Sequence, residues 1–75
     1  MTIVYSFSDD TGTYYVPTKR AAISAARAAI TASGGDDTFV SVSRIVIASG
    51  LPRRELACRL LNNESFAAEQ EDVPL

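Results

Sequence analysis

Residues 39–48 have a sequence that is dense in β-branched side chains: Phe39-Val40-Ser41-Val42-Ser43-Arg44-Ile45-Val46-Ile47-Ala48. Such side chains favour extended backbone, so this run predicts a strand, the longest of the fold and a central one. Its alternation is imperfect, because Val42 shares a phase with Arg44 while Ile45 and Ile47 occupy the other. We therefore expect either a bulge near Ser43 and Arg44 or a strand whose end is covered on both faces.

Upstream of this strand, the sequence predicts a hairpin followed by a helix. Residues 2–8 and 13–16 alternate with a period of two around Asp9-Asp10-Thr11-Gly12, whose acceptor side chains and glycine favour a tight turn. After Pro17, Thr18 is a suitable N-cap for an alanine-rich helix from Lys19 to Ala32. The small side chains of this helix allow close approach of the sheet or of a second copy, which permits a homodimer.

Downstream, a second helix is predicted to begin at Gly50-Leu51-Pro52 and to end at Asn62 or Asn63, with an apolar face formed by Leu56, Ala57, Leu60 and Leu61. Residues 64–75 are acidic and show little periodicity, so they are expected to form a tail after a single domain of residues 1–63. The predicted fold is an α+β domain of order ββαβα. Its three-stranded, antiparallel-containing sheet is backed by two helices, and the outer face of the sheet is left partly open.

The composition excludes most enzyme chemistry. The 75 residues include no histidine and one cysteine, Cys58, so histidine-based catalysis and ordinary zinc sites are absent, and neither a metal nor a cofactor is expected. Asp10-Thr11-Gly12 matches the short signature of aspartic proteases, but it lies in a predicted turn and lacks the second carboxylate of that chemistry. No apolar run has the ~20 residues of a membrane span, and no secretory signal is visible, so we expect a cytoplasmic, non-enzymatic protein.

Charge is concentrated in blocks, although the formal net charge is only −2. If the two helices pack side by side, their arginines form a continuous basic surface of Arg20, Arg27, Arg53, Arg54 and Arg59. Alternatively, the acidic groups imitate a phosphate backbone: Asp9, Asp10, Asp36, Asp37, Glu64, Glu69, Glu71 and Asp72. A third possible contact surface consists of the tyrosines Tyr5, Tyr14 and Tyr15. The alternative is that these side chains only stabilise the hairpin through cross-strand pairs. The candidate partner-binding residues are thus Arg20, Arg27, Arg53, Arg54, Arg59, Asp36, Asp37 and Tyr14.

Residues 45–56 also resemble a helix-turn-helix, with Gly50 in the turn and Arg53 and Arg54 facing DNA. This alternative makes the protein a small DNA-binding transcription regulator. It requires a helix where the β-branched residues favour a strand, and acidic groups outnumber basic ones by nine to seven. No specific binding to nucleic acid is therefore expected, and a strand at residues 39–49 would eliminate the motif.

In overall character, the chain resembles the small phage-encoded anti-CRISPR proteins of type I systems. The similarity lies in its length, its acidity, its α+β organisation and its arginine-bearing helices, as in Thr18-Lys19-Arg20-Ala21-Ala22-Ile23 and Pro52-Arg53-Arg54-Glu55-Leu56. It includes no diagnostic motif and transfers no functional residue. The resemblance implies a protein that binds a subunit of the CRISPR effector complex in the host cytoplasm and sterically blocks DNA recognition or nuclease recruitment.

Overall fold

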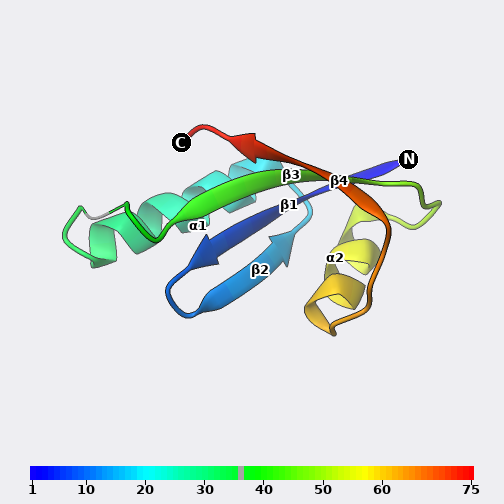
Figure 1. Ribbon diagram of the computed structural model, residues 1–75, viewed down its shortest axis with the longest axis horizontal. Helices are drawn as coiled ribbons and strands as arrows, with labels where there is room; N and C mark the ends of the chain where they lie inside the picture. Colours follow the sequence, from blue (N-terminus) through cyan, green and yellow to red (C-terminus); the bar gives the residue numbers. More distant parts are fainter. Residues whose placement is uncertain (36) are drawn as a thin grey trace.

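The computed structural model describes residues 1–35 and 37–75, which form an α+β domain with one antiparallel sheet (Figure 1). The elements are β1 (Thr2–Asp9), β2 (Gly12–Val16), α1 (Lys19–Ala32), β3 (Ser41–Ile47), α2 (Arg53–Leu61) and β4 (Ala68–Val73). The strand order is β2-β1-β3-β4. The α+β class is confirmed, but the sheet has four strands rather than three, and the element order is ββαβαβ.

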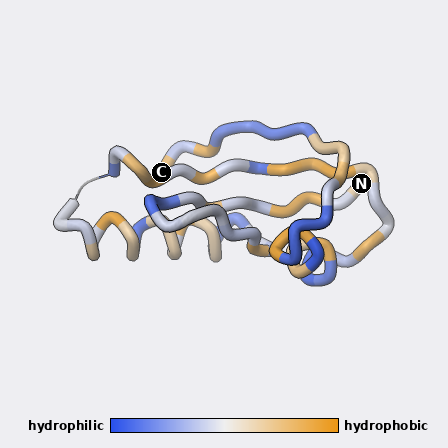
Figure 2. The backbone as a smooth tube through the Cα atoms, turned by 60° about the horizontal axis from the view of Figure 1, so that its bottom comes forward, coloured by the Kyte–Doolittle hydropathy of each residue, from blue (hydrophilic) through white to orange (hydrophobic). Residues whose placement is uncertain are grey.

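The fourth strand lies in the acidic segment that was expected to form a tail. Its residues pair with β3 in a register that runs from Val42↔Val73 to Ile47↔Ala68. The sequence shows no apolar alternation here because β4 is an edge strand, exposed along its length except at Val73. Figure 2 shows it as the hydrophilic outer strand of the sheet.

The helix α1 begins and ends where the sequence predicts, and each strand of the β1–β2 hairpin is one residue longer than predicted, because Asp9 and Gly12 are also paired. Asp9 Oδ1 accepts hydrogen bonds from the Thr11 and Gly12 amides at 2.8 and 3.2 Å, which closes the turn. Thr18 caps α1, its hydroxyl oxygen accepting from the Ala21 amide at 3.2 Å. At the other end, Gly34 and Gly35 adopt φ angles of 77° and 94°, a conformation that glycine reaches without steric cost.

The core is divided between the two faces of the sheet. Val4 and Ile45, which oppose each other, pack with Leu56 and Ala57 of α2. Phe7 and Val42, also a cross-strand pair, pack with the fully buried Ala22 and Ala26 of α1. Within each strand the two core residues are three positions apart, so they point to opposite faces. The helices therefore cover opposite faces.

This division explains the imperfect alternation of β3. Its register with β1 is continuous from Thr2↔Ile47 to Ser8↔Ser41, so no bulge is present. Val42 faces α1 while Ile45 and Ile47 face α2, which corresponds to the expected alternative of cover on both faces. The strand is interior, as predicted, but β1 with eight residues is longer than β3 with seven.

The helices also lie toward different ends of the sheet (Figure 1). The 14 residues of α1 span about 21 Å, roughly half of the 40 Å long axis of the molecule. The two helices make no contact with each other in the described part of the chain. The hydroxyl of Thr2 anchors the segment before α2, donating to the Ser49 and Leu51 carbonyl oxygens at 3.0 and 2.8 Å.

Within α2, the predicted apolar face is correct at three of four positions. Leu56 and Ala57 are buried and Leu60 packs against them, whereas Leu61 is 49% exposed and is not part of this cluster. Pro52 is the N-cap residue rather than the first helical residue, and Asn62 caps the C-terminus.

Candidate interaction surface

The predicted continuous basic surface does not exist, because the two helices lie on opposite faces. Arg20 and Arg27 belong to α1, and the other three predicted arginines, Arg53, Arg54 and Arg59, belong to α2. The sequence predicted each helix correctly but not the face of the sheet that each covers. The arginines must therefore be considered as two separate sets.

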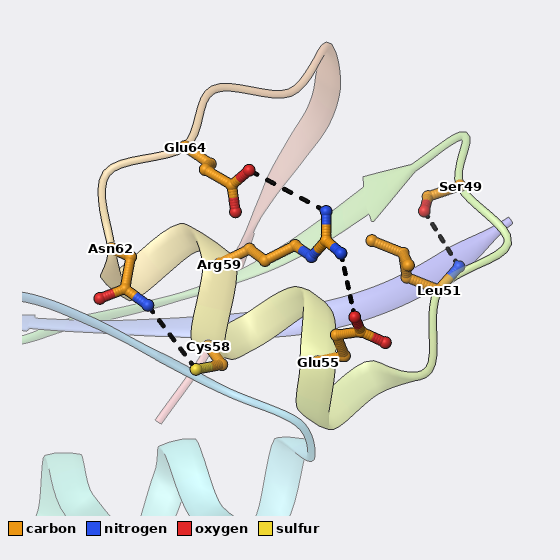
Figure 3. A network of polar contacts seen from close by, with 7 residues as sticks. All are labelled: Ser49, Leu51, Glu55, Cys58, Arg59, Asn62 and Glu64. Atoms are coloured by element: carbon orange, nitrogen blue, oxygen red, sulfur yellow. Dashed lines mark hydrogen bonds and ion pairs between the residues drawn. The ribbon is translucent and has the colours of Figure 1, made fainter.

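Two of the seven cations are neutralised by neighbouring carboxylates. Arg59 contacts Glu55 at 3.0 Å and Glu64 at 4.0 Å, so it links α2 to the segment that leads into β4 (Figure 3). Arg44 lies 3.8 Å from Glu71 across the β3–β4 pair. The remaining five cations form no ion pair within residues 1–35 and 37–75: Lys19, Arg20, Arg27, Arg53 and Arg54.

Three of these unpaired cations surround one apolar side chain on α1. A shallow groove on the outside of the helix is lined by Lys19, Arg20, Ile23, Ser24 and Arg27, which we call the basic face of α1. Ile23 is half-buried and the other four are exposed. Arg20 and Arg27 were predicted as contact residues, whereas Lys19, Ile23 and Ser24 were missed. The i, i+4, i+8 spacing of Lys19, Ile23 and Arg27 is the sequence signal that identifies this stripe.

The position of the first two cations is unfavourable for the isolated helix. Lys19 and Arg20 occupy the first turn of α1, which contains no acidic residue. The N-terminus of a helix carries partial positive charge, so a cation there costs about 0.3–1 kcal/mol. In α2, Arg53 and Arg54 also lie in the first turn, but Glu55 in the same turn and Arg59 in the last turn are favourably placed. The α1 sequence therefore retains charges that oppose its own stability.

On α2, Arg53 and Arg54 are exposed and precede Glu55 in the same turn. Neither residue lines the groove on α1 or the depression beside Asp9. These two arginines thus form an exposed basic patch that is separate from the basic face of α1.

Five of the nine acidic residues occupy two sites, the hairpin turn and β4. At one end, Asp9 and Asp10 line a depression with the exposed Phe39. The Thr11 hydroxyl, which donates to Asp9 Oδ1 at 2.6 Å, is the main cause that lowers the pKa of Asp9. Asp37 is exposed in the loop before β3, whereas Asp36, the other predicted acidic contact, lies outside the described residues. The second site is β4.

The three tyrosines do not form one surface. Tyr14 stacks on Phe7 with 5.7 Å between ring centroids, and its hydroxyl lies 3.1 Å from the Thr11 hydroxyl. Tyr5 packs with the α1 cluster, and Tyr15 packs on the opposite face with the α2 cluster. The predicted cross-strand pairing is confirmed for Tyr14, which nevertheless remains 43% exposed.

The remaining sequence motifs are accounted for by the fold. Asp10-Thr11-Gly12 lies at the hairpin turn, and β3 occupies the place of the first helix of the helix-turn-helix, so that motif is absent. Cys58 is exposed on α2, and its sulfur accepts a hydrogen bond from the side-chain Nδ2 of Asn62 at 3.8 Å (Figure 3). Among the described residues, no cluster of three potential metal ligands occurs. Neither described helix is long and apolar enough to cross a membrane.

Comparison with known proteins yields no relative. Neither a protein-family model, nor a curated protein, nor a solved structure matches the chain.

Proposed function

We propose that the protein is a small non-enzymatic inhibitor that binds an acidic surface of a protein partner through the basic face of α1. The observation that carries this proposal is the presence of Lys19 and Arg20 in the first turn of α1, which contains no acidic residue, with no carboxylate partner for either among residues 1–35 and 37–75. Local rules are commonly broken at functional sites, where a partner supplies the compensating interaction. An acidic partner would supply it here.

The composition of this face favours a protein over a nucleic acid. An apolar centre with a charged rim is the usual anatomy of a protein interface, and Ile23 with its three surrounding cations has that arrangement. Guanidinium groups such as those of Arg20 and Arg27 match the geometry of carboxylates with two parallel hydrogen bonds. The net charge of −2 and the acidic β4 would repel a phosphate backbone at longer range.

The resemblance to the phage anti-CRISPR proteins leads us to propose that the partner is a subunit of a type I CRISPR interference complex. Binding would block DNA recognition or nuclease recruitment sterically. Candidate partners are recovered by affinity pull-down from a lysate of cells that carry such a system. Inhibition is then measured as target-DNA binding and cleavage by the purified complex at increasing inhibitor concentration.

The decisive variant is Arg20→Glu/Arg27→Glu, and its matched control is Arg53→Glu/Arg54→Glu, which changes the net charge equally on the opposite face. We expect the α1 variant to lose inhibition and the α2 variant to retain it. Loss in both would indicate a general charge effect. Retention in the α1 variant would reject the basic face as the recognition surface.

A second candidate function is imitation of nucleic acid by β4. Glu69 and Glu71 lie on the same side of this exposed edge strand, with their Cα atoms about 6.8 Å apart. They form a row of two carboxylates, of which Glu71 also pairs with Arg44. If this row enters a nucleic-acid channel, Glu69→Gln/Glu71→Gln should abolish inhibition while the α1 variant remains active. The same assay thus separates the two candidates.

A further inference from the structure

The two edges of the sheet differ sharply in chemistry. The β4 edge carries three carboxylates within Ala68–Val73, whereas the β2 edge, Gly12–Val16, carries no charge at all. Edge strands expose unpaired N–H and C=O groups, and proteins commonly protect them with charges, prolines or bulges. Here only one edge is protected, because Pro17 follows β2 rather than interrupting it.

We propose that β2 pairs with β2 of a second copy, in antiparallel orientation, to form a homodimer with a continuous eight-stranded sheet. This inference does not depend on the proposed function. Antiparallel pairing of two identical strands about a two-fold axis matches each residue with one symmetrically placed about the centre. To pair all five residues of β2, Tyr14 must oppose Tyr14 of the second copy and Thr13 must oppose Tyr15.

The exposure of Tyr14 is consistent with this register. Its ring stacks on Phe7 on one side and is 43% exposed overall. Residues that oppose each other across an antiparallel pair have Cβ atoms about 4.5–5.5 Å apart, and aromatic pairs there are stabilising. The dimer would therefore extend the pair into a row of four rings, Phe7 and Tyr14 from each copy.

The charges that flank β2 in the sequence lie beyond its ends rather than along the strand. Two carboxylates, Asp9 and Asp10, lie in the turn before β2, and Asp9 is held within that turn by Thr11 and Gly12. Ala29 and Ala32 line the depression beside Asp9 and Asp10, so the side of α1 nearest the hairpin carries alanines. The cations of α1 lie on the basic face instead, which leaves that face available in the dimer.

The charge on β4 limits the assembly to two chains. In the dimer, both outer edges of the sheet are β4 strands with Glu69, Glu71 and Asp72. Pairing of two such edges would place like charges opposite each other, which is destabilising. The sheet can therefore grow at β2 only, and the two-fold axis closes it.

Sedimentation equilibrium measures the association of the wild-type chain at concentrations from ~1 to ~500 μM. This range covers the dissociation constants expected for a small interface. We expect a monomer–dimer equilibrium with no larger species. Tyr14→Lys and Tyr14→Glu place like charges on the axis, and each should weaken association by roughly tenfold or more. A mixture of the two variants pairs lysine with glutamate and should restore the dimer. Gln70→Lys, a charge on the other edge strand, should leave it unchanged.

Several outcomes would overturn the proposal. The first is a wild-type chain that stays monomeric or forms larger species. The second is a pair of Tyr14 variants that each remain dimeric, or a mixture of the two folded variants that fails to associate. The third is a Gln70→Lys chain that no longer forms the dimer. Should the Tyr14 variants not fold, amide hydrogen exchange of the wild type decides. Protection in residues 12–16 that rises with concentration supports the dimer, and concentration-independent exchange refutes it.

Discussion

Reversing the charge of Arg20 is expected to make the protein more stable while it weakens binding of the proposed partner. Arg20 is the second residue of α1 and is exposed, with Ile23 and Ser24 three and four positions ahead. A glutamate there gains no ion pair along the helix, so the change isolates the interaction with the helix dipole. Removing an unfavourable interaction and adding a favourable one should stabilise by about 0.5–1.5 kcal/mol at low salt. For a domain of this size, the midpoint of thermal unfolding should rise by about 2–12 °C.

Arg27→Glu is the matched control, because it changes the net charge equally but lies in the middle of α1, where the dipole has little effect. Arginine and glutamate have similar helix propensities, so that difference does not contribute. Thermal and urea unfolding are followed by circular dichroism at ~20 mM and at ~1 M salt, where screening should remove most of the gain. An Arg20→Glu chain that is no more stable than Arg27→Glu at low salt would refute the argument that α1 retains unfavourable charge.

Three further predictions concern the fold. Hydrogen bonds, chiefly from Thr11, hold the pKa of Asp9 below its ordinary value of 3.8. The ionised Asp9 therefore stabilises the folded chain above the pKa of the unfolded state, and this stabilisation is lost as the pH falls through the pKa of the folded state. Asp9→Asn should therefore flatten the decline of stability between about pH 5 and pH 2, measured by urea unfolding across that range. Leu56→Ala, at a fully buried position, should cost about 2–5 kcal/mol in the same assay, whereas Leu61→Ala should cost less than half as much. Removal of residues 68–75 should expose the hydrophobic edge of β3 and cause aggregation visible by light scattering, and a soluble, equally stable truncated chain would show that β4 is dispensable.

The sequence was sufficient for the elements whose signals are local. The bounds of α1 follow from a capping threonine, an alanine-rich run and paired glycines, all within a few residues of the ends they set. The hairpin turn at Asp9-Asp10-Thr11-Gly12 is likewise fixed by side chains that bond to their own backbone. For the candidate interaction surface, Arg20 and Arg27 could be assigned to an exposed helical stripe because helical periodicity alone determines which residues share a side.

Only the tertiary structure decided which elements share a face and whether the acidic segment joins the sheet. The residues of β4 contain no apolar alternation, so their extended conformation depends on hydrogen bonding to β3, a partner more than 20 positions away in the chain. Apolar residues of β3 occur on both faces of the strand, so its sequence is compatible with a helix on either side. The packing of Ala22 and Leu56 on opposite faces separates the two sets of arginines. Local propensity acts over neighbouring residues, whereas burial and strand pairing are properties of the assembled sheet.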